Sequence, residues 1–309
     1  MAERQLVLVT GKGGVGKTTL TAAYARASAD AGLKTLVGEV TSDLGTRSSL
    51  LSLFGRATQQ GEEPISLERS LDGVRVTPQT GHRLLLRSAL RVGMLADAAM
   101  RSAALNRFLM AAPAFPEIGT LYQLVWLLRL GRYDRIVLDL PATGHAIGLA
   151  KLPRTVARVV PKGIIHEAIT EGLDALTDAT RTGVIVASLP EVLPVSEAFE
   201  LADAFRELEV PVGAMVLNRV PEDPFTEEER QTLDAYIRAR RGELLLGTRE
   251  LRRLERALDA KAIFEAREVP GAATAELPVF GGPWPAVIRD TATRLVELGL
   301  APRGKGRVR

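Results

Sequence analysis

A glycine-rich loop near the start of the chain places the strongest constraint on its fold. Residues 11–18 read Gly-Lys-Gly-Gly-Val-Gly-Lys-Thr and fill every fixed position of the phosphate-binding pattern G-x-x-x-x-G-K-[ST]. Glycines let successive backbone N–H groups converge on nucleotide phosphates, the lysine reaches the terminal phosphates, and the threonine hydroxyl binds Mg²⁺. The predicted nucleotide-binding residues are Gly11, Gly13, Gly14, Val15, Gly16, Lys17, Thr18 and Thr19.

The flanking sequence places this loop between a strand and a helix, as phosphate binding requires. Residues 6–9 form a short aliphatic run, and residues 18–25 begin a helical pattern whose N-terminus would face the phosphates. The same glycines also spell G-x-G-x-x-G, and Glu39 ends the next predicted strand, as in a dinucleotide-binding fold. That alternative is disfavoured because it has no use for the Lys-Thr-Thr of residues 17–19.

The loop also contains a second lysine, Lys12, which the minimal phosphate-binding scheme does not use. In a chain of this kind, the Lys12 side chain could reach a nucleotide held by a second subunit. This extra lysine therefore favours a dimer that is operated by nucleotide.

Strand-like and helical segments alternate along the chain, which is typical of a parallel sheet covered on both faces. The predicted strands are 5–10, 35–40, 73–77, 135–140, 183–188, 212–218 and 276–280. We therefore expect one α/β domain over residues 1–300, a P-loop NTPase with a doubly wound, mostly parallel sheet. Its ligands should gather at the carboxyl ends of the strands.

The longest interval between predicted strands, residues 78–134, is too long for a simple crossover and is rich in Ala, Leu and Met. It predicts an inserted helical subdomain at about 82–118. Three of the five methionines lie between residues 94 and 110, and methionine-rich faces repack easily around hydrophobic partners. Apolar helical stripes also commonly pack within their own domain, so both interpretations stay open.

Charge and composition limit the other classes of function. Four basic residues at 303–309 account for more than the whole net charge of +3, so residues 301–309 predict a basic, disordered tail. We do not expect nucleic-acid binding, whereas peripheral membrane association through the tail is compatible with the charge. The chain has no cysteine, no signal-like start and no apolar run of about 18–20 residues, so we expect a soluble, cytoplasmic protein.

A second motif completes the predicted site. The strand at 135–139 ends in Asp139, and residues 140–145 read Leu-Pro-Ala-Thr-Gly-His. A carboxylate at the end of such a strand can hold Mg²⁺ opposite Thr18. The loop around Gly144 is suited to sensing the γ-phosphate.

Residues 11–19 and 139–145 together resemble the arsenite-efflux (ArsA) and tail-anchored-protein-targeting (Get-pathway) ATPase family, part of the deviant Walker A (SIMIBI) class. The resemblance extends over most of residues 5–285. It includes residues 76–79, 112–117, 150–153, 189–195 and 216–219.

The resemblance implies a fuller set of roles. Lys12 and Lys17 would act on the phosphates of ATP, Thr18 and Asp139 would bind Mg²⁺, and Asn218 would bind adenine. Without the resemblance, Asn218 is an ordinary turn former at a strand end, although its amide offers the donor and acceptor that adenine needs. The family also implies a homodimer, or a heterodimer with a related ATPase, and a hydrophobic client bound by helices at 84–115.

The chain departs from the family at two points. Thr41 occupies the position where the family usually has an aspartate that orients the attacking water, and Asp43 follows two residues later. Asp43 is the predicted catalytic carboxylate if the loop is shifted; otherwise hydrolysis is slow or is completed by a different subunit. The lack of cysteine excludes thiolate capture of arsenite and a zinc-clamped dimer.

Three hypotheses follow. The leading one is an ATPase whose dimer couples ATP to the capture or release of a hydrophobic client. The alternatives are a low-turnover regulatory or scaffold subunit, and a partition-type positioning ATPase. The roles of His145 and Glu117 stay open.

Overall fold

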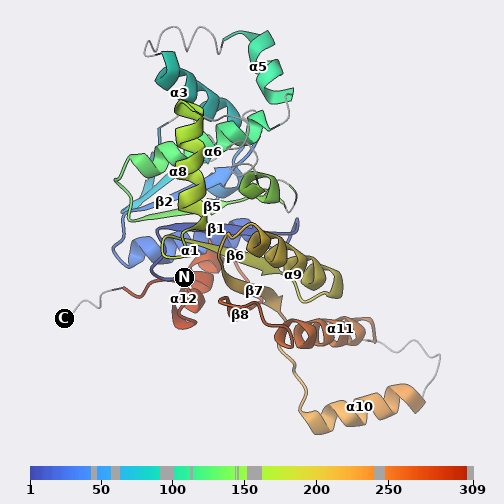
Figure 1. Ribbon diagram of the computed structural model, residues 1–309. Helices are drawn as coiled ribbons and strands as arrows, with labels where there is room; N and C mark the ends of the chain where they lie inside the picture. The colour runs from blue at the N-terminus through green and yellow to red at the C-terminus, as the bar shows by residue number, and fades with distance from the viewer. Residues whose placement is uncertain are drawn as a thin grey trace.

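A computed structural model describes residues 1–42, 47–56, 63–90, 101–111, 114–142, 144, 146–151, 162–239 and 248–304. An eight-stranded sheet with the order β3-β4-β2-β5-β1-β6-β7-β8 forms its centre (Figure 1). The strands are β1 Leu6–Gly11, β2 Thr35–Val40, β3 Ile65–Glu68, β4 Leu71–Val76, β5 Arg135–Asp139, β6 Thr182–Ser188, β7 Val212–Val220 and β8 Ala273–Pro278.

All neighbouring strands are parallel except β3, which pairs antiparallel with β4. The prediction of a mostly parallel sheet is therefore confirmed. The sequence analysis missed β3 because this four-residue edge strand is partly exposed and carries no apolar run.

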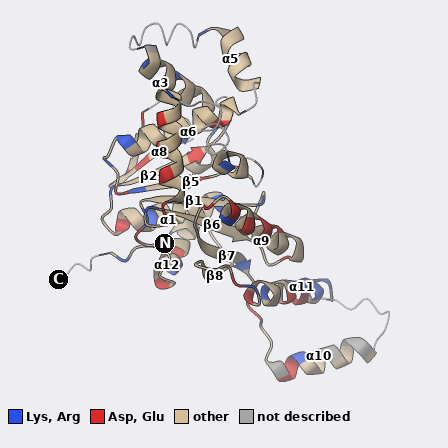
Figure 2. Ribbon diagram, viewed as in Figure 1, with Lys and Arg blue, Asp and Glu red and all other residues tan. Residues whose placement is uncertain are grey.

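Helices cover both faces of the sheet, as the doubly wound prediction required. They are α1 Lys17–Asp30, α2 Ser49–Ser52, α3 Pro78–Leu90, α5 Ala103–Ala111, α6 Phe115–Arg129, α8 Ile164–Thr177, α9 Val192–Glu207, α10 Glu227–Ala239, α11 Thr248–Glu265 and α12 Trp284–Glu297. The strand side chains on one face of the sheet form a buried cluster with α1 and α12. Those on the opposite face form a second cluster with α6, α8, α9 and α11. Charged residues are mostly on the helices rather than on the central strands (Figure 2).

The order of the central strands brings the two sequence motifs together. β1 and β5 are entirely buried, and β1 lies between β5 and β6. In their register Val9 pairs with Asp139, and on the other side of β5 Glu39 of β2 also pairs with Asp139. The loop that follows β1 therefore begins beside the carboxylate that ends β5.

The helices between β4 and β5 pack tightly where α3 crosses α6. A Cβ built on Gly81 would lie 1.7 Å from the Gly119 carbonyl oxygen, so the two helix backbones are in direct contact. Parts of the predicted insertion, residues 91–100 and 112–113, lie outside the described residues. Within the described part, Phe108 of α5 is 62% exposed, whereas much of α6 is buried.

His82, on α3, makes this helical region sensitive to acid. Its Nε2 lies 2.8 Å from the Phe115 carbonyl oxygen, its Nδ1 is buried without a hydrogen-bond partner, and burial lowers its pKa. His82 therefore takes up its second ring proton more readily in the unfolded chain than in the folded chain. The free energy of unfolding decreases as the pH falls below the ordinary histidine pKa of about 6.5.

We expect His82→Leu to be less stable than the wild type at pH 7.5 by about 1 kcal/mol, because the bond to the Phe115 carbonyl is lost. From pH 7.5 to 5.5, however, its unfolding free energy should decrease less than that of the wild type. Urea unfolding of both proteins at the two pH values measures this difference. Equal pH dependence would show that His82 is not the acid-sensitive group.

Within the described residues, no helix combines the length and apolar character needed to cross a membrane. Most of the predicted tail, residues 305–309, lies outside the described residues. The limits of the insertion and of the tail therefore stay predictions.

Candidate nucleotide site

The 11–18 loop has a backbone that only glycine adopts readily. Gly11, Gly14 and Gly16 have φ angles of 143°, 84° and 93°, and Gly16 immediately precedes the first turn of α1. Space is also limited: a Cβ on Gly11 would lie 2.2 Å from the Ala187 carbonyl oxygen, and one on Gly16 would lie 2.4 Å from Asn218 Nδ2. A glycine-dependent loop that leads directly into the positive end of α1 is the arrangement that an anion site requires.

Lys17 lies at the start of α1, and its ammonium group turns back over the loop. Its Nζ donates a hydrogen bond to the Lys12 carbonyl oxygen at 2.8 Å. Burial lowers the pKa of Lys17, and the nearby Asp139 carboxylate partly opposes that shift. A positive charge that is partly desolvated and held by one neutral acceptor is suited to a phosphate ligand.

Thr18 and Asp139 form the predicted metal-side pair. Thr18 Oγ1 donates to Asp139 Oδ2 at 2.7 Å. The other carboxylate oxygen, Oδ1, is buried without a hydrogen-bond partner, and burial raises the pKa of Asp139 to about 6. Bonding from Thr18 and the charge of Lys17 oppose this rise, and the nearby Glu39 adds to it.

These two residues fit Mg²⁺, because a cation would satisfy the unpartnered oxygen and stabilise the ionised carboxylate. Among the described residues, no group of three or more His, Cys, Asp or Glu side chains could hold a metal by itself. The ion would therefore take its remaining ligands from phosphate and water, which is the usual arrangement for Mg²⁺.

Glu39 is a site residue whose position the sequence analysis missed. It pairs in register with Asp139 on the neighbouring strand, so both side chains point to the face that α1 covers. The Ser48 hydroxyl, which also caps α2, donates to the Glu39 carboxylate. The available signal was a carboxylate at the end of the 35–40 strand, which the sequence analysis considered only for the dinucleotide alternative.

Of the two residues discussed for water activation, only Thr41 is described. Its backbone N–H donates to the Val76 carbonyl oxygen at 3.0 Å, which fixes the chain just beyond β2. Asp43 lies outside the described residues, as does His145. Glu117 is in the first turn of α6, close to Gly148 in the helical segment that follows the 139–145 motif.

Asn218, at the end of β7, contacts the loop itself. Its Nδ2 donates to the Val15 carbonyl oxygen at 2.8 Å, and its Oδ1 accepts from the Arg219 N–H at 3.0 Å. Asn218 also lines a pocket of about 320 Å³ together with Gly16 and Thr19. The pocket is also lined by Pro278 at the end of β8, by Val279, Phe280 and Gly282 in the segment that follows, and by Trp284 at the start of α12. A nucleoside attached to phosphates in the loop would enter this pocket.

The Lys12 side chain forms an ion pair within its own chain. Its Nζ lies 2.8 Å from Glu197 Oε1 on α9, and each side chain is about one-third exposed (38% and 32%). The sequence analysis did not anticipate Glu197, because 185 residues separate it from Lys12.

Comparison with known proteins identifies the family to which the chain belongs. Residues 4–169, more than half of the chain, match the family described as Anion-transporting ATPase. The chain is 29% identical over 225 residues to the ATPase BagA of Mycobacterium tuberculosis, a match that covers 70% of this chain and 65% of that protein.

More distant relatives include the Arsenical pump-driving ATPase of Escherichia coli and an ATPase ASNA1 homolog of Trypanosoma cruzi. The first is 26% identical over 257 residues, covering 76% of this chain and 42% of that protein. The second is 23% identical over 281 residues, covering 75% of this chain and 78% of that protein. The dinucleotide-binding alternative does not fit these matches. The chain belongs to the anion-transporting (ArsA) ATPase family.

Proposed function

We propose that the chain binds and hydrolyses ATP with Mg²⁺, and that ATP closes it into a dimer. The observation that carries this proposal is the pairing of Thr18 with Asp139 beside a loop whose geometry requires glycine. The relatives are named as ATPases, and the chain spans only about two-thirds of the mycobacterial one. A cytoplasmic location is part of the proposal.

Each residue of the site has a defined task in this scheme. Bound Mg²⁺ would neutralise phosphate charge that develops during hydrolysis. The loop N–H groups and Lys17 would hold the terminal phosphates, Thr18 and Asp139 would hold the ion, and Asn218, which also contacts the loop, would bind adenine. Because Thr41 has no carboxylate, we assign the orientation of the attacking water to Glu39 or to Asp43.

The contact between Lys12 and Glu197 supports a specific model for dimer closure. To reach a nucleotide in a second chain, Lys12 must leave Glu197. An exposed pair of this kind contributes only about 0.2–1 kcal/mol, so phosphate charge across the dimer could displace it. ATP would then favour the dimer because only the closed state gains the Lys12–phosphate contact.

We expect Lys12→Ala to abolish ATP-dependent dimerisation while nucleotide binding by the monomer persists. Glu197→Gln should promote dimerisation about 2- to 30-fold, because two such pairs no longer need to be broken. Sedimentation velocity with Mg²⁺ and a non-hydrolysable ATP analogue measures both effects. Lys34→Ala removes an exposed lysine elsewhere and serves as the control. Unchanged dimerisation of Lys12→Ala would contradict the cross-subunit role.

The helical region at 84–115 is the proposed site for a hydrophobic client. The exposed Phe108 on α5 supports this placement, although only part of the region is described. Photo-crosslinking from position 108 in the ATP-bound and ADP-bound chain would test it. A crosslinked client in one nucleotide state only is the expected result, and none in either state would contradict it.

Thr41 favours one alternative from a different class, a low-turnover nucleotide-binding subunit that pairs with a related ATPase. In that case the partner would supply the missing carboxylate. Negligible phosphate release by the purified chain, rising when a related ATPase is added, would support this alternative over the leading proposal.

A further inference from the structure

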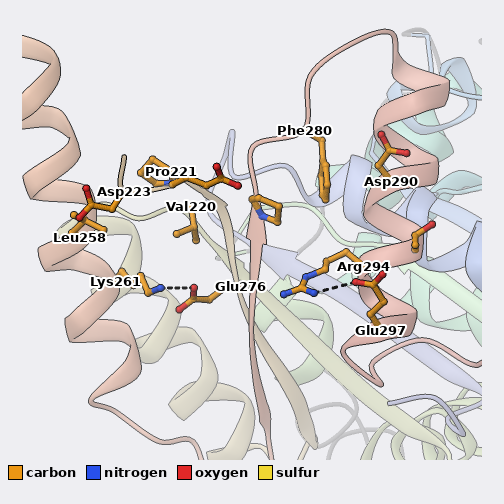
Figure 3. Close-up of a pocket in the computed structure, with 13 residues that line it drawn as sticks. Val220, Pro221, Asp223, Leu258, Lys261, Glu276, Phe280, Asp290, Arg294 and Glu297 are labelled. Carbon is orange, nitrogen blue, oxygen red and sulfur yellow. Dashed lines mark hydrogen bonds and ion pairs between the residues drawn. The ribbon is translucent and has the colours of Figure 1, made fainter. Parts of the chain in front are cut away.

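The outer edge of β8 borders a groove that shares only Pro278 and Phe280 with the nucleoside pocket. β8 is the last strand of the sheet and pairs only with β7 in the described part of the chain. α11 lies on one side of it and α12 on the other, which Figure 3 shows with the strand between the two helices. Together with the residues after β7, they enclose a pocket of about 840 Å³.

A strand edge carries unpaired backbone N–H and C=O groups at alternate residues, and these can bind an added strand. Ala275 and Leu277 point into the core on the α12 side, whereas Glu276 points toward α11 and pairs with Lys261 at 2.8 Å. The side chains of β8 therefore occupy its two faces and leave its outer edge open. An extended segment is the ligand shape that fits such an edge.

The charges that line the groove indicate which charge a bound segment should carry. Five acidic residues and two basic residues line it. Both basic side chains already have carboxylate partners inside the groove, since Lys261 pairs with Glu276 and Arg294 pairs with Glu297 at 3.1 Å. The acidic residues beyond these pairs are Glu222, Asp223 and Asp290.

Two of these three have other contacts: Asp223 pairs with Arg230, and Asp290 pairs with the highly exposed Arg289 at 3.3 Å. Glu222 forms no ion pair within the described residues. Glu222 is therefore the lining acid whose charge is left without an ion pair, and this charge favours a basic ligand. It also disfavours pairing of two β8 edges from two copies of this chain, because that would bring two acidic grooves together.

We propose that this groove binds an extended, basic segment of a partner protein by adding it as a strand beside β8. Lysine or arginine side chains of the segment would face Glu222 and Asp290. Its backbone would bond to residues 273–278. Phe280 and Leu258 provide apolar surface for the intervening side chains.

The test uses the full chain without nucleotide, so its outcome does not depend on the ATPase proposal. A fluorescent peptide of four Lys-Val repeats with capped ends should bind, as measured by anisotropy at low salt, and the matching Glu-Val peptide should not. The double variant Glu222→Gln with Asp290→Asn should weaken binding about 2- to 10-fold. Glu207→Gln, an exposed acid on α9, should have no effect.

Two further measurements separate strand addition from simple charge attraction. Bound peptide should slow hydrogen exchange at the backbone amides of residues 273–277. N-methylation of one set of alternate peptide residues should prevent binding, whereas N-methylation of the other set should not. Failure of the basic peptide to bind would overturn the proposal. Binding that leaves exchange in β8 unchanged, or that is unaffected by the double variant, would also overturn it.

Discussion

Lys17→Ala is expected to lower ATP turnover by about 10²- to 10³-fold, the usual cost of removing one preorganised charge-stabilising group from an active site. The side chain of Lys17 contributes little to the stability of the fold. Its ammonium group is partly buried, its pKa is lowered by that burial, and its hydrogen bond is to the carbonyl of Lys12. The folded chain should therefore tolerate the substitution.

Phosphate release at saturating Mg²⁺ and ATP measures this effect, and thermal unfolding checks the fold. Lys34→Ala is a matched control, because it removes the same charge from an exposed position. Lys34→Ala should turn over ATP as the wild type does. Full turnover by Lys17→Ala would show that the 11–18 loop is not the catalytic phosphate site.

Asp139→Asn should have opposite effects on the free chain and on the Mg²⁺-nucleotide complex. Burial raises the pKa of Asp139 to about 6 from an ordinary value of 3.8. The folded chain therefore binds this proton more tightly than the unfolded chain, and stability decreases as the pH rises from about 4 to about 6. Above pH 6 the buried, ionised carboxylate of Asp139 lowers the free energy of unfolding by up to about 3 kcal/mol.

An asparagine at position 139 carries no charge and can still accept the Thr18 hydrogen bond. In EDTA at pH 7.5, the variant should therefore unfold at a higher urea concentration than the wild type. With Mg²⁺ and ADP the order should reverse, because the chain that retains the carboxylate binds the Mg²⁺-nucleotide more tightly and gains more stability from it. Asp174→Asn, an exposed change on α8, should follow the wild type in both conditions. A variant that is less stable than the wild type in EDTA would show that the carboxylate has a structural role instead.

Local sequence was sufficient to predict seven of the eight strands and the glycine-rich loop. Continuous aliphatic runs predict β1 and β5 because strands buried on both faces need apolar side chains in succession. The glycines of residues 11–16 predict a loop that no other residue could form without strain. β8 was displaced by a few residues in the prediction, since its first two residues, Ala273 and Thr274, are exposed and give no apolar signal.

Contacts between distant parts of the chain could not be predicted in this way. The hydrogen bond from Asn218 to Val15 joins residues 203 positions apart, and the ion pair of Lys12 with Glu197 joins residues 185 positions apart. The position of Glu39 beside Asp139 depends on the strand order β2-β5, which sequence patterns alone do not specify.

The most direct test of an ATPase gated by dimer formation is phosphate release by the purified wild-type chain over a wide range of chain concentrations. We predict turnover that requires Mg²⁺, with a rate per chain that rises with concentration until the dimer is fully formed. A rate per chain that is independent of concentration would contradict gating by dimer formation. No Mg²⁺-dependent phosphate release at any concentration would contradict the assignment of this chain as an ATPase.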